Sequence, residues 1–158
     1  MTRKTNSLDR VVAAAQSLGL EIQVQEMDVS TRSAEDAARA VGCDVAQIVK
    51  SLIFERQDNG DLVLALVSGA HHADIEILAQ HFGSALTRAD PRKIRDVTGF
   101  AIGGVAPIGH LQPIATVMDA ALLAHDHVWA AAGKPMAVFK VQASAMRDVL
   151  DCVVIDVK

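Results

Sequence analysis

Two apolar runs on either side of an Asn-Gly dipeptide constrain the fold of this chain more than any other feature. Ser51–Glu55 and Leu62–Val67 have the length and composition of β-strands, and Asn59 and Gly60 between them favour a tight turn. This pattern predicts a β-hairpin inside a sheet. Further strand patterns are expected at Glu21–Met27, Ile114–Met118, His127–Ala131, Met136–Val141 and Val153–Val157.

Helical periodicity separates several of these strands, and most of the helices have recognisable start and stop signals. The expected N-caps are Ser7, Ser33, Asp74 and Asp90, and the expected ends are Gly19, Gly42, Gly83 and Gly99. Asp44 can cap a short turn, and a last helix is expected near Ala145–Leu150. Because no repeat or linker interrupts the pattern, residues 1–158 are interpreted as a single α+β domain with a mixed sheet of about seven strands.

Composition and charge exclude several functional classes. Hydrophobic residues make up 51% of the 158 residues, which is typical of a compact globular chain. Lys and Arg number 15 against 19 Asp and Glu, giving a net charge of -4 that argues against a DNA-binding protein. The two cysteines have no CxxC spacing, and no apolar run is long enough for a signal peptide or a membrane span. These features predict a cytoplasmic protein that contacts neither DNA nor a membrane.

The segment Phe100–His110, FAIGGVAPIGH, fits neither a helix nor a regular strand. Its glycines allow positive φ and close approach of a ligand to backbone N–H groups, while Pro107 stiffens the backbone. Such a loop can bind an oxyanion or a carbonyl. An apolar turn at a sheet edge is an equally good interpretation of the glycines and proline alone.

Lys50 is the only charge in the apolar run Ile48–Phe54, IVKSLIF. Burial of an unpaired ammonium is costly, so the lysine either extends its charged end into water or faces a phosphate or carbonyl of a ligand. The residues alone leave both interpretations open.

In combination, five segments resemble the YbaK/prolyl-tRNA synthetase editing-domain family of free-standing aminoacyl-tRNA deacylases. They are SAEDAARAVG, IVKSLIF, LVLALVSG, TGFAIGGVAPIGH and TVMDAALL, and the resemblance covers about Ser33–Val157. The family's two signatures are a strand lysine and a GxxxP loop, which correspond here to Lys50 and Gly103–Pro107. The resemblance implies a partly barrel-like sheet and removal of a small non-cognate amino acid such as Ala, Cys or 2-aminobutyrate, most often from tRNA-Pro.

The resemblance also implies a mechanism without a side-chain nucleophile or a cofactor. Water attacks the ester, the 2′-hydroxyl of the terminal adenosine helps to position it, and loop amides stabilise the developing oxyanion. The expected catalytic residues are Lys50, Gly103, Gly104 and Val105, and the expected substrate-binding residues are Pro107, Gly109, His110, Ser68 and Gly69. Lys50 would hold the terminal nucleotide or the substrate carbonyl. The expected partners are the aminoacylated tRNA 3′ end and a prolyl-tRNA synthetase that presents it.

Two other functions compete with this hypothesis. His71 and His72 are adjacent and His125 and His127 have strand spacing, which raises a metal hydrolase, although no HExxH motif accompanies them. Alternatively, the domain binds aminoacyl-tRNA or a synthetase without hydrolysis. His71, His72 and the segment Ala130–Met136 also depart from the family pattern, and Lys134 in that segment could alter tRNA contacts.

Overall fold

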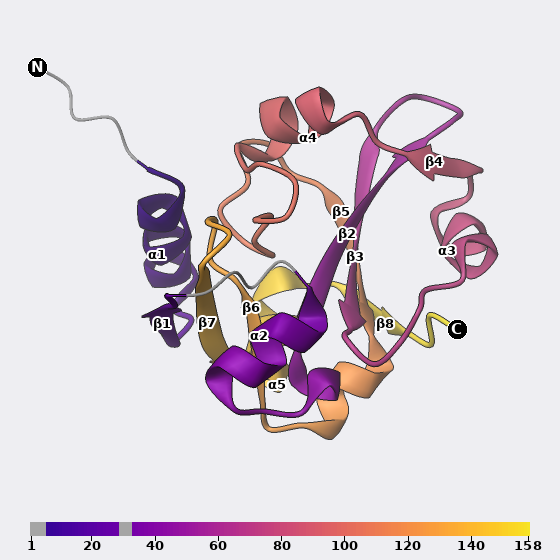
Figure 1. Ribbon diagram of the computed structural model, residues 1–158. Helices are drawn as coiled ribbons and strands as arrows, with labels where there is room; N and C mark the ends of the chain where they lie inside the picture. Colours follow the sequence, from indigo (N-terminus) through magenta and orange to yellow (C-terminus); the bar gives the residue numbers. More distant parts are fainter. Residues whose placement is uncertain (1–5, 29–32) are drawn as a thin grey trace, which may run out of the picture.

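The computed structural model describes residues 6–28 and 33–158 and shows an α+β arrangement of short helices around two sheets (Figure 1). The elements follow one another in the order α1 (Ser7–Leu18), β1 (Ile22–Glu26), α2 (Ala34–Val41), η1 (Val45–Gln47), β2 (Val49–Arg56), β3 (Leu62–Ser68), α3 (Ile75–Phe82), β4 (Leu86–Arg88), α4 (Pro91–Thr98), β5 (Ala115–Asp119), η2 (Ala120–Ala124), β6 (His127–Ala131), β7 (Ala137–Gln142), α5 (Ala143–Leu150) and β8 (Val153–Ile155).

Local sequence signals account for the helix boundaries. The predicted caps Ser33, Asp74 and Asp90 each accept a hydrogen bond from the backbone of the first helical turn. Four helices end at a glycine in the left-handed conformation, as predicted. The prediction of Ser7 as a cap is wrong. The N-cap of α1 is Asn6, whose side-chain oxygen accepts a hydrogen bond from the Asp9 N–H at 2.8 Å.

The strands form two separate sheets. β1, β7 and β6 make an antiparallel three-stranded sheet in that order, and β4, β2, β3, β5 and β8 make a mixed five-stranded sheet. The hairpin of β2 and β3 is confirmed, with Lys50 opposite Val67. Neither sheet closes on itself, so the expectation of a partly barrel-like sheet is wrong. The structure also adds β4, a strand of three residues that the sequence pattern did not predict, to the seven expected ones.

A shared hydrophobic core joins the two sheets. Leu64, Leu66 and Met118 of the large sheet lie in the same buried cluster as Phe139 and Val141 of the small one. A second cluster packs α3 against the other face of β3. In the described part of the chain, no helix has both the length and the apolar character needed to cross a membrane.

The glycine-rich segment follows α4 and leads into β5 without regular structure, as predicted. Arg10 of α1 fixes its beginning by donating to the Gly99 carbonyl at 2.6 Å and by lying over the Phe100 ring at 4.7 Å from the centroid. Phe100 is fully buried. The loop is therefore anchored on one helix and on the core, which orients its exposed part, residues 101–103.

Candidate functional site

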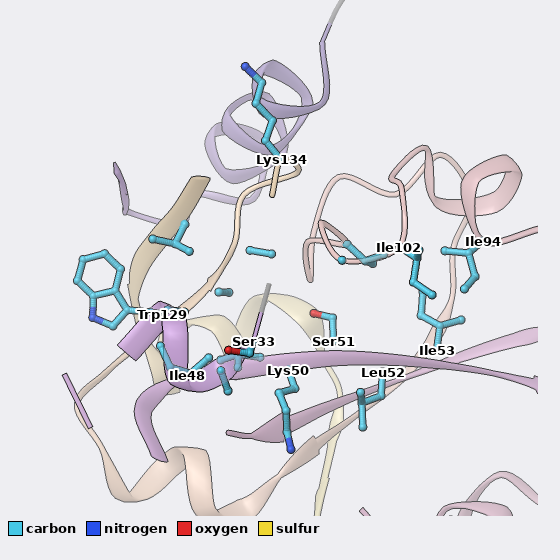
Figure 2. Close-up of a pocket in the computed structure, with 18 of the residues that line it drawn as sticks. Ser33, Ile48, Lys50, Ser51, Leu52, Ile53, Ile94, Ile102, Trp129 and Lys134 are labelled. Carbon is cyan, nitrogen blue, oxygen red and sulfur yellow. The ribbon is translucent and has the colours of Figure 1, made fainter. Parts of the chain in front are cut away.

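A cavity of about 460 Å³ lies between β2, α2, β6 and the glycine-rich loop (Figure 2). A pocket of this size can accommodate a small ligand. Its walls are mostly aliphatic. The residues that line it are Ser33, Ala34, Ala37, Ile48, Val49, Lys50, Ser51, Leu52, Ile53, Phe54, Arg88, Ala89, Ile94, Ile102, Gly103, Val105, Trp129, Ala130, Ala131, Lys134 and Val138.

Three of the predicted catalytic residues line this cavity, namely Lys50, Gly103 and Val105. Gly103 has a φ of +90°, and a Cβ built on it would meet nothing within 4 Å. Among the described residues, the backbone N–H groups of Gly103 and Val105 have no hydrogen-bond partner. Unpaired N–H groups at a cavity wall are available to a ligand oxygen.

Gly104 differs from its two neighbours. Its N–H donates to the Ala101 carbonyl at 3.0 Å, so this amide closes a turn within the loop. A Cβ on Gly104 would lie 3.4 Å from the backbone of Lys134, which is ordinary contact. The three loop amides expected to bind the oxyanion therefore differ: Gly103 and Val105 line the cavity and their N–H groups have no partner among the described residues, whereas the Gly104 N–H closes a turn within the loop.

The remaining loop residues lie behind the cavity wall. Pro107 is buried, and Gly109 packs against the backbone of Arg10. His110 donates from Nε2 to the Ala106 carbonyl at 2.7 Å and contacts the Phe100 ring edge-on. Burial lowers the pKa of His110, which keeps its imidazole neutral near pH 7. These residues hold the loop in shape and do not line the cavity.

Lys50 contributes to the cavity wall, but its charge lies elsewhere. Figure 2 shows its side chain directed away from Ser51 and Ile53, on the opposite side of β2. The ammonium donates to the His71 carbonyl, and burial lowers the pKa of Lys50 while the carboxylates of Glu35 and Asp119 oppose that shift. The ammonium is therefore not brought against the Gly103 loop.

The predicted substrate contacts Ser68 and Gly69 are occupied by internal interactions. Ser68 is 1% exposed, and its hydroxyl donates to the Ala46 carbonyl at 2.8 Å. The Gly69 N–H donates to the Ile48 carbonyl at 2.7 Å. The buried carboxylate of Asp119 accepts from the Ser68 N–H and contacts His71 Nδ1 at 2.9 Å. Ser68 and Gly69 do not line the cavity.

Three residues with cationic side chains line the cavity, although the whole chain is acidic. Lys50, Arg88 and Lys134 line it, and no Asp or Glu is among its described lining residues. Figure 2 shows Lys134 at the edge, with its ammonium directed outwards. Sequence reasoning missed Arg88, because only the pairing of Arg88 with Phe54 across β4 and β2 brings it here. It also missed Ser51, whose neighbours depend on the fold.

Two other kinds of reactive group, metal ligands and cysteine thiols, were also considered in this fold. Within residues 6–28 and 33–158, no group of three or more His, Cys, Asp or Glu side chains is arranged to hold a metal ion. Burial raises the pKa of both cysteine thiols, which disfavours the reactive thiolate. Neither cysteine lines the cavity.

Comparison with known proteins agrees with this architecture. The family model of the aminoacyl-tRNA editing domain matches residues 28–149. A crystal structure described as a candidate trans-editing enzyme for prolyl tRNA synthetase superposes with a TM-score of 0.90 at 39% identity, covering 99% of each chain. The uncharacterized protein YwhH of Bacillus subtilis is 30% identical over 113 residues, covering 72% of this chain and 71% of that protein.

The relation extends to a synthetase. The proline–tRNA ligase of Thermosipho melanesiensis is 35% identical over 81 residues, which cover 51% of this chain but only 14% of the ligase. Part of this chain thus resembles a short segment of a much longer synthetase. The chain belongs to the aminoacyl-tRNA editing domain family.

Proposed function

We propose that this protein hydrolyses the ester bond of mischarged aminoacyl-tRNA, with tRNA-Pro carrying a small non-cognate amino acid as the substrate. The observation that carries the proposal is that Gly103 and Val105, whose N–H groups have no partner among the described residues, line a cavity together with Lys50, Arg88 and Lys134. Membership of the editing-domain family and the similarity to a synthetase segment support the choice of an aminoacyl ester.

The chemistry requires little from side chains. Water attacks the carbonyl carbon of the ester, and the carbonyl oxygen becomes an oxyanion that accepts hydrogen bonds from Gly103 and Val105. The ester C–O bond then breaks, the amino acid leaves as a carboxylic acid that ionises, and the tRNA 3′-oxygen takes a proton. Each well-placed donor in such a site contributes about 3 kcal/mol to transition-state stabilisation.

Lys50 contacts the nucleotide part of the substrate in this proposal. Its position on the other side of β2 from Ser51 favours this role over contact with the ester oxygen. An ammonium has three donors, so Lys50 can keep its bond to the His71 carbonyl and still bind a phosphate or ribose oxygen. Arg88 and Lys134 supply further positive charge for the anionic 3′ end.

The direct test is a deacylation assay with a panel of mischarged tRNA-Pro species that carry Ala, Cys, Ser, Thr or 2-aminobutyrate. Catalytic amounts of the protein should release many equivalents of amino acid from at least one of them. Stoichiometric binding without turnover on every member would contradict the proposal and favour a non-catalytic tRNA-binding module.

A further inference from the structure

The first turn of α1 lies against three separate glycines, two of which stand at the ends of the glycine-rich loop. A Cβ on Gly99 would lie 2.9 Å from the guanidinium carbon of Arg10, and a Cβ on Gly109 would lie 3.3 Å from the Arg10 carbonyl oxygen. A Cβ on Gly133 would lie 2.9 Å from the carbonyl oxygen of Ser7. No larger residue fits at these positions without moving α1 or the Arg10 side chain.

Arg10 makes the polar contact of this junction. Its Nη2 donates to the Gly99 carbonyl at 2.6 Å, and its guanidinium lies over the Phe100 ring. The same ring contacts His110 edge-on, so Arg10 reaches the beginning of the loop directly and its end through Phe100. Within the described residues no carboxylate pairs with Arg10, so this carbonyl and this ring fix its guanidinium.

The two ends of the loop are also bonded to each other. The N–H groups of Leu111 and Gln112 donate to the carbonyls of Thr98 and Val97, at 3.2 and 3.0 Å respectively. The loop is therefore closed at its base, where the end of α4 and the first turn of α1 meet. Because the loop has no regular structure above this base, a shift at the base changes the direction of the backbone beside the cavity.

We infer that Arg10 is a positioning residue for the proposed hydrolysis, because it holds the base of the glycine-rich loop and so keeps the backbone of Gly103 and Val105 in place beside the cavity. The inference rests on the proposed function and adds a residue of α1 to that site. The family model matches residues 28–149, so α1 lies outside the matched segment. Arg10 does not line the cavity and acts only through the loop. Small displacements of groups that stabilise a transition state have large effects on rate.

Steady-state kinetics of Arg10→Met test this role, because methionine keeps a long side chain over Phe100 but lacks the charge and the donor. The kcat on the most active mischarged tRNA should fall by at least about tenfold, with KM within about threefold of the parent value. Arg10→Lys, which keeps a cation and a donor, should recover most of that loss. The matched control is Arg147→Met, since Arg147 is a partly buried arginine of α5 that does not line the cavity, and both constants should stay unchanged in it.

Amide hydrogen exchange measures the loop without any turnover. The Gly104 N–H bonds to the Ala101 carbonyl within the loop, so its exchange rate reports local opening. Arg10→Met should speed exchange at Gly104 by about tenfold and leave exchange at the fully buried Leu64 of β3 within about threefold. An equal increase at both amides would show a general loss of stability and contradict the positioning role. Unchanged exchange at Gly104 would contradict it as well.

The two measurements together separate failure of this inference from failure of the proposed function. If the parent hydrolyses no mischarged tRNA but Arg10→Met speeds exchange at Gly104 alone, Arg10 still holds the loop, and only the proposed hydrolysis is contradicted. If the parent is active and Arg10→Met has the same kcat, the assignment of Arg10 is overturned and the proposed hydrolysis stands.

Discussion

Two glycine-containing loops of this protein, residues 68–72 and residues 100–110, were both expected to contact the substrate, but their structures differ. In the first, the polar groups of Ser68, Gly69 and Asp119 are satisfied by one another and by the neighbouring backbone. In the second, Gly103 and Val105 line a cavity, and their N–H groups lack partners within the described residues. A glycine next to a strand therefore does not by itself indicate a binding site.

The glycines of these loops also serve opposite physical needs. A Cβ on Gly69 would lie 2.5 Å from the Val45 carbonyl oxygen and 2.9 Å from the Ala34 Cβ, so this position requires glycine for close packing. A Cβ on Gly103 would meet nothing within 4 Å, and its φ of +90° sets the direction of the backbone. The first glycine is needed for close packing, and the second sets the course of the loop backbone beside the cavity.

The largest expected effect is on turnover in Gly103→Ala. The added methyl group strains the backbone at positive φ and turns the loop N–H groups away from the oxyanion, which should reduce the single-turnover rate by about a hundredfold. Gly83→Ala is a matched control, because Gly83 also has a positive φ of +76° and open surroundings but lies at the end of α3. Both variants should lose about 1 kcal/mol of stability. Equal rate losses in the two would refute the role of the loop.

Gly69→Ala should affect stability instead. Overpacking against the Val45 carbonyl and Ala34 is expected to lower the free energy of unfolding by about 2 kcal/mol. Urea denaturation measures this value. After correction for the folded fraction, deacylation should stay close to that of the parent. A stable variant with impaired catalysis would show that the 68–72 loop contacts the substrate after all.

Lys50→Ala should reduce kcat/KM by at least about tenfold, corresponding to about 1.4 kcal/mol, with most of the effect on KM. The reason is the loss of a cation at the nucleotide end of the cavity, as proposed above. Lys93→Ala is the control, since Lys93 pairs with Glu55 and does not line the cavity. If Lys50→Ala is folded by circular dichroism and as active as the parent, the lysine has no substrate role.

The smallest expected effect is on the pH dependence of stability, and it involves His110. Burial lowers the folded-state pKa of this imidazole from its ordinary value of 6.5. As the pH falls below 6.5, the unfolded chain binds this proton more readily than the folded protein does. The neutral imidazole therefore contributes to the free energy of unfolding above pH 6.5, and this contribution is lost as the pH falls towards the folded-state pKa. Urea denaturation between pH 5 and pH 7.5 should show a weaker pH dependence in His110→Gln than in the parent. Identical dependence would mean that His110 does not contribute.

Much of the fold could be predicted because its signals are local. Ser33, Asp74 and Asp90 cap helices through contacts within a few residues, and Gly60 shapes the hairpin turn within the same range. Asn6 replaced the expected Ser7 as a cap because both residues suit the position and only the geometry decides. The short strand β4 and the absence of barrel closure depend on long-range pairing, which leaves little trace in the sequence.

Part of the candidate site could also be predicted, because its motifs are short and local. The strand lysine and the GxxxP loop could be recognised as motifs, and both Lys50 and Gly103 do line one cavity. The direction of the Lys50 side chain, the use of the Gly104 amide within the loop and the unpaired hydroxyl of Ser51 could not be foreseen. Each depends on which neighbours the folded chain provides.

The most direct measurement of the central claim is the response of individual backbone amides to a bound substrate analogue. A stable 3′-aminoacyl-amide analogue of the terminal adenosine can be titrated into the ¹⁵N-labelled protein and followed by NMR. The amide signals of Gly103 and Val105 should shift downfield as they acquire a hydrogen-bond acceptor, while those of Ser68 and Gly69 should remain in place. Saturation of binding with unchanged Gly103 and Val105 signals would contradict the assignment of this loop as the oxyanion-binding element.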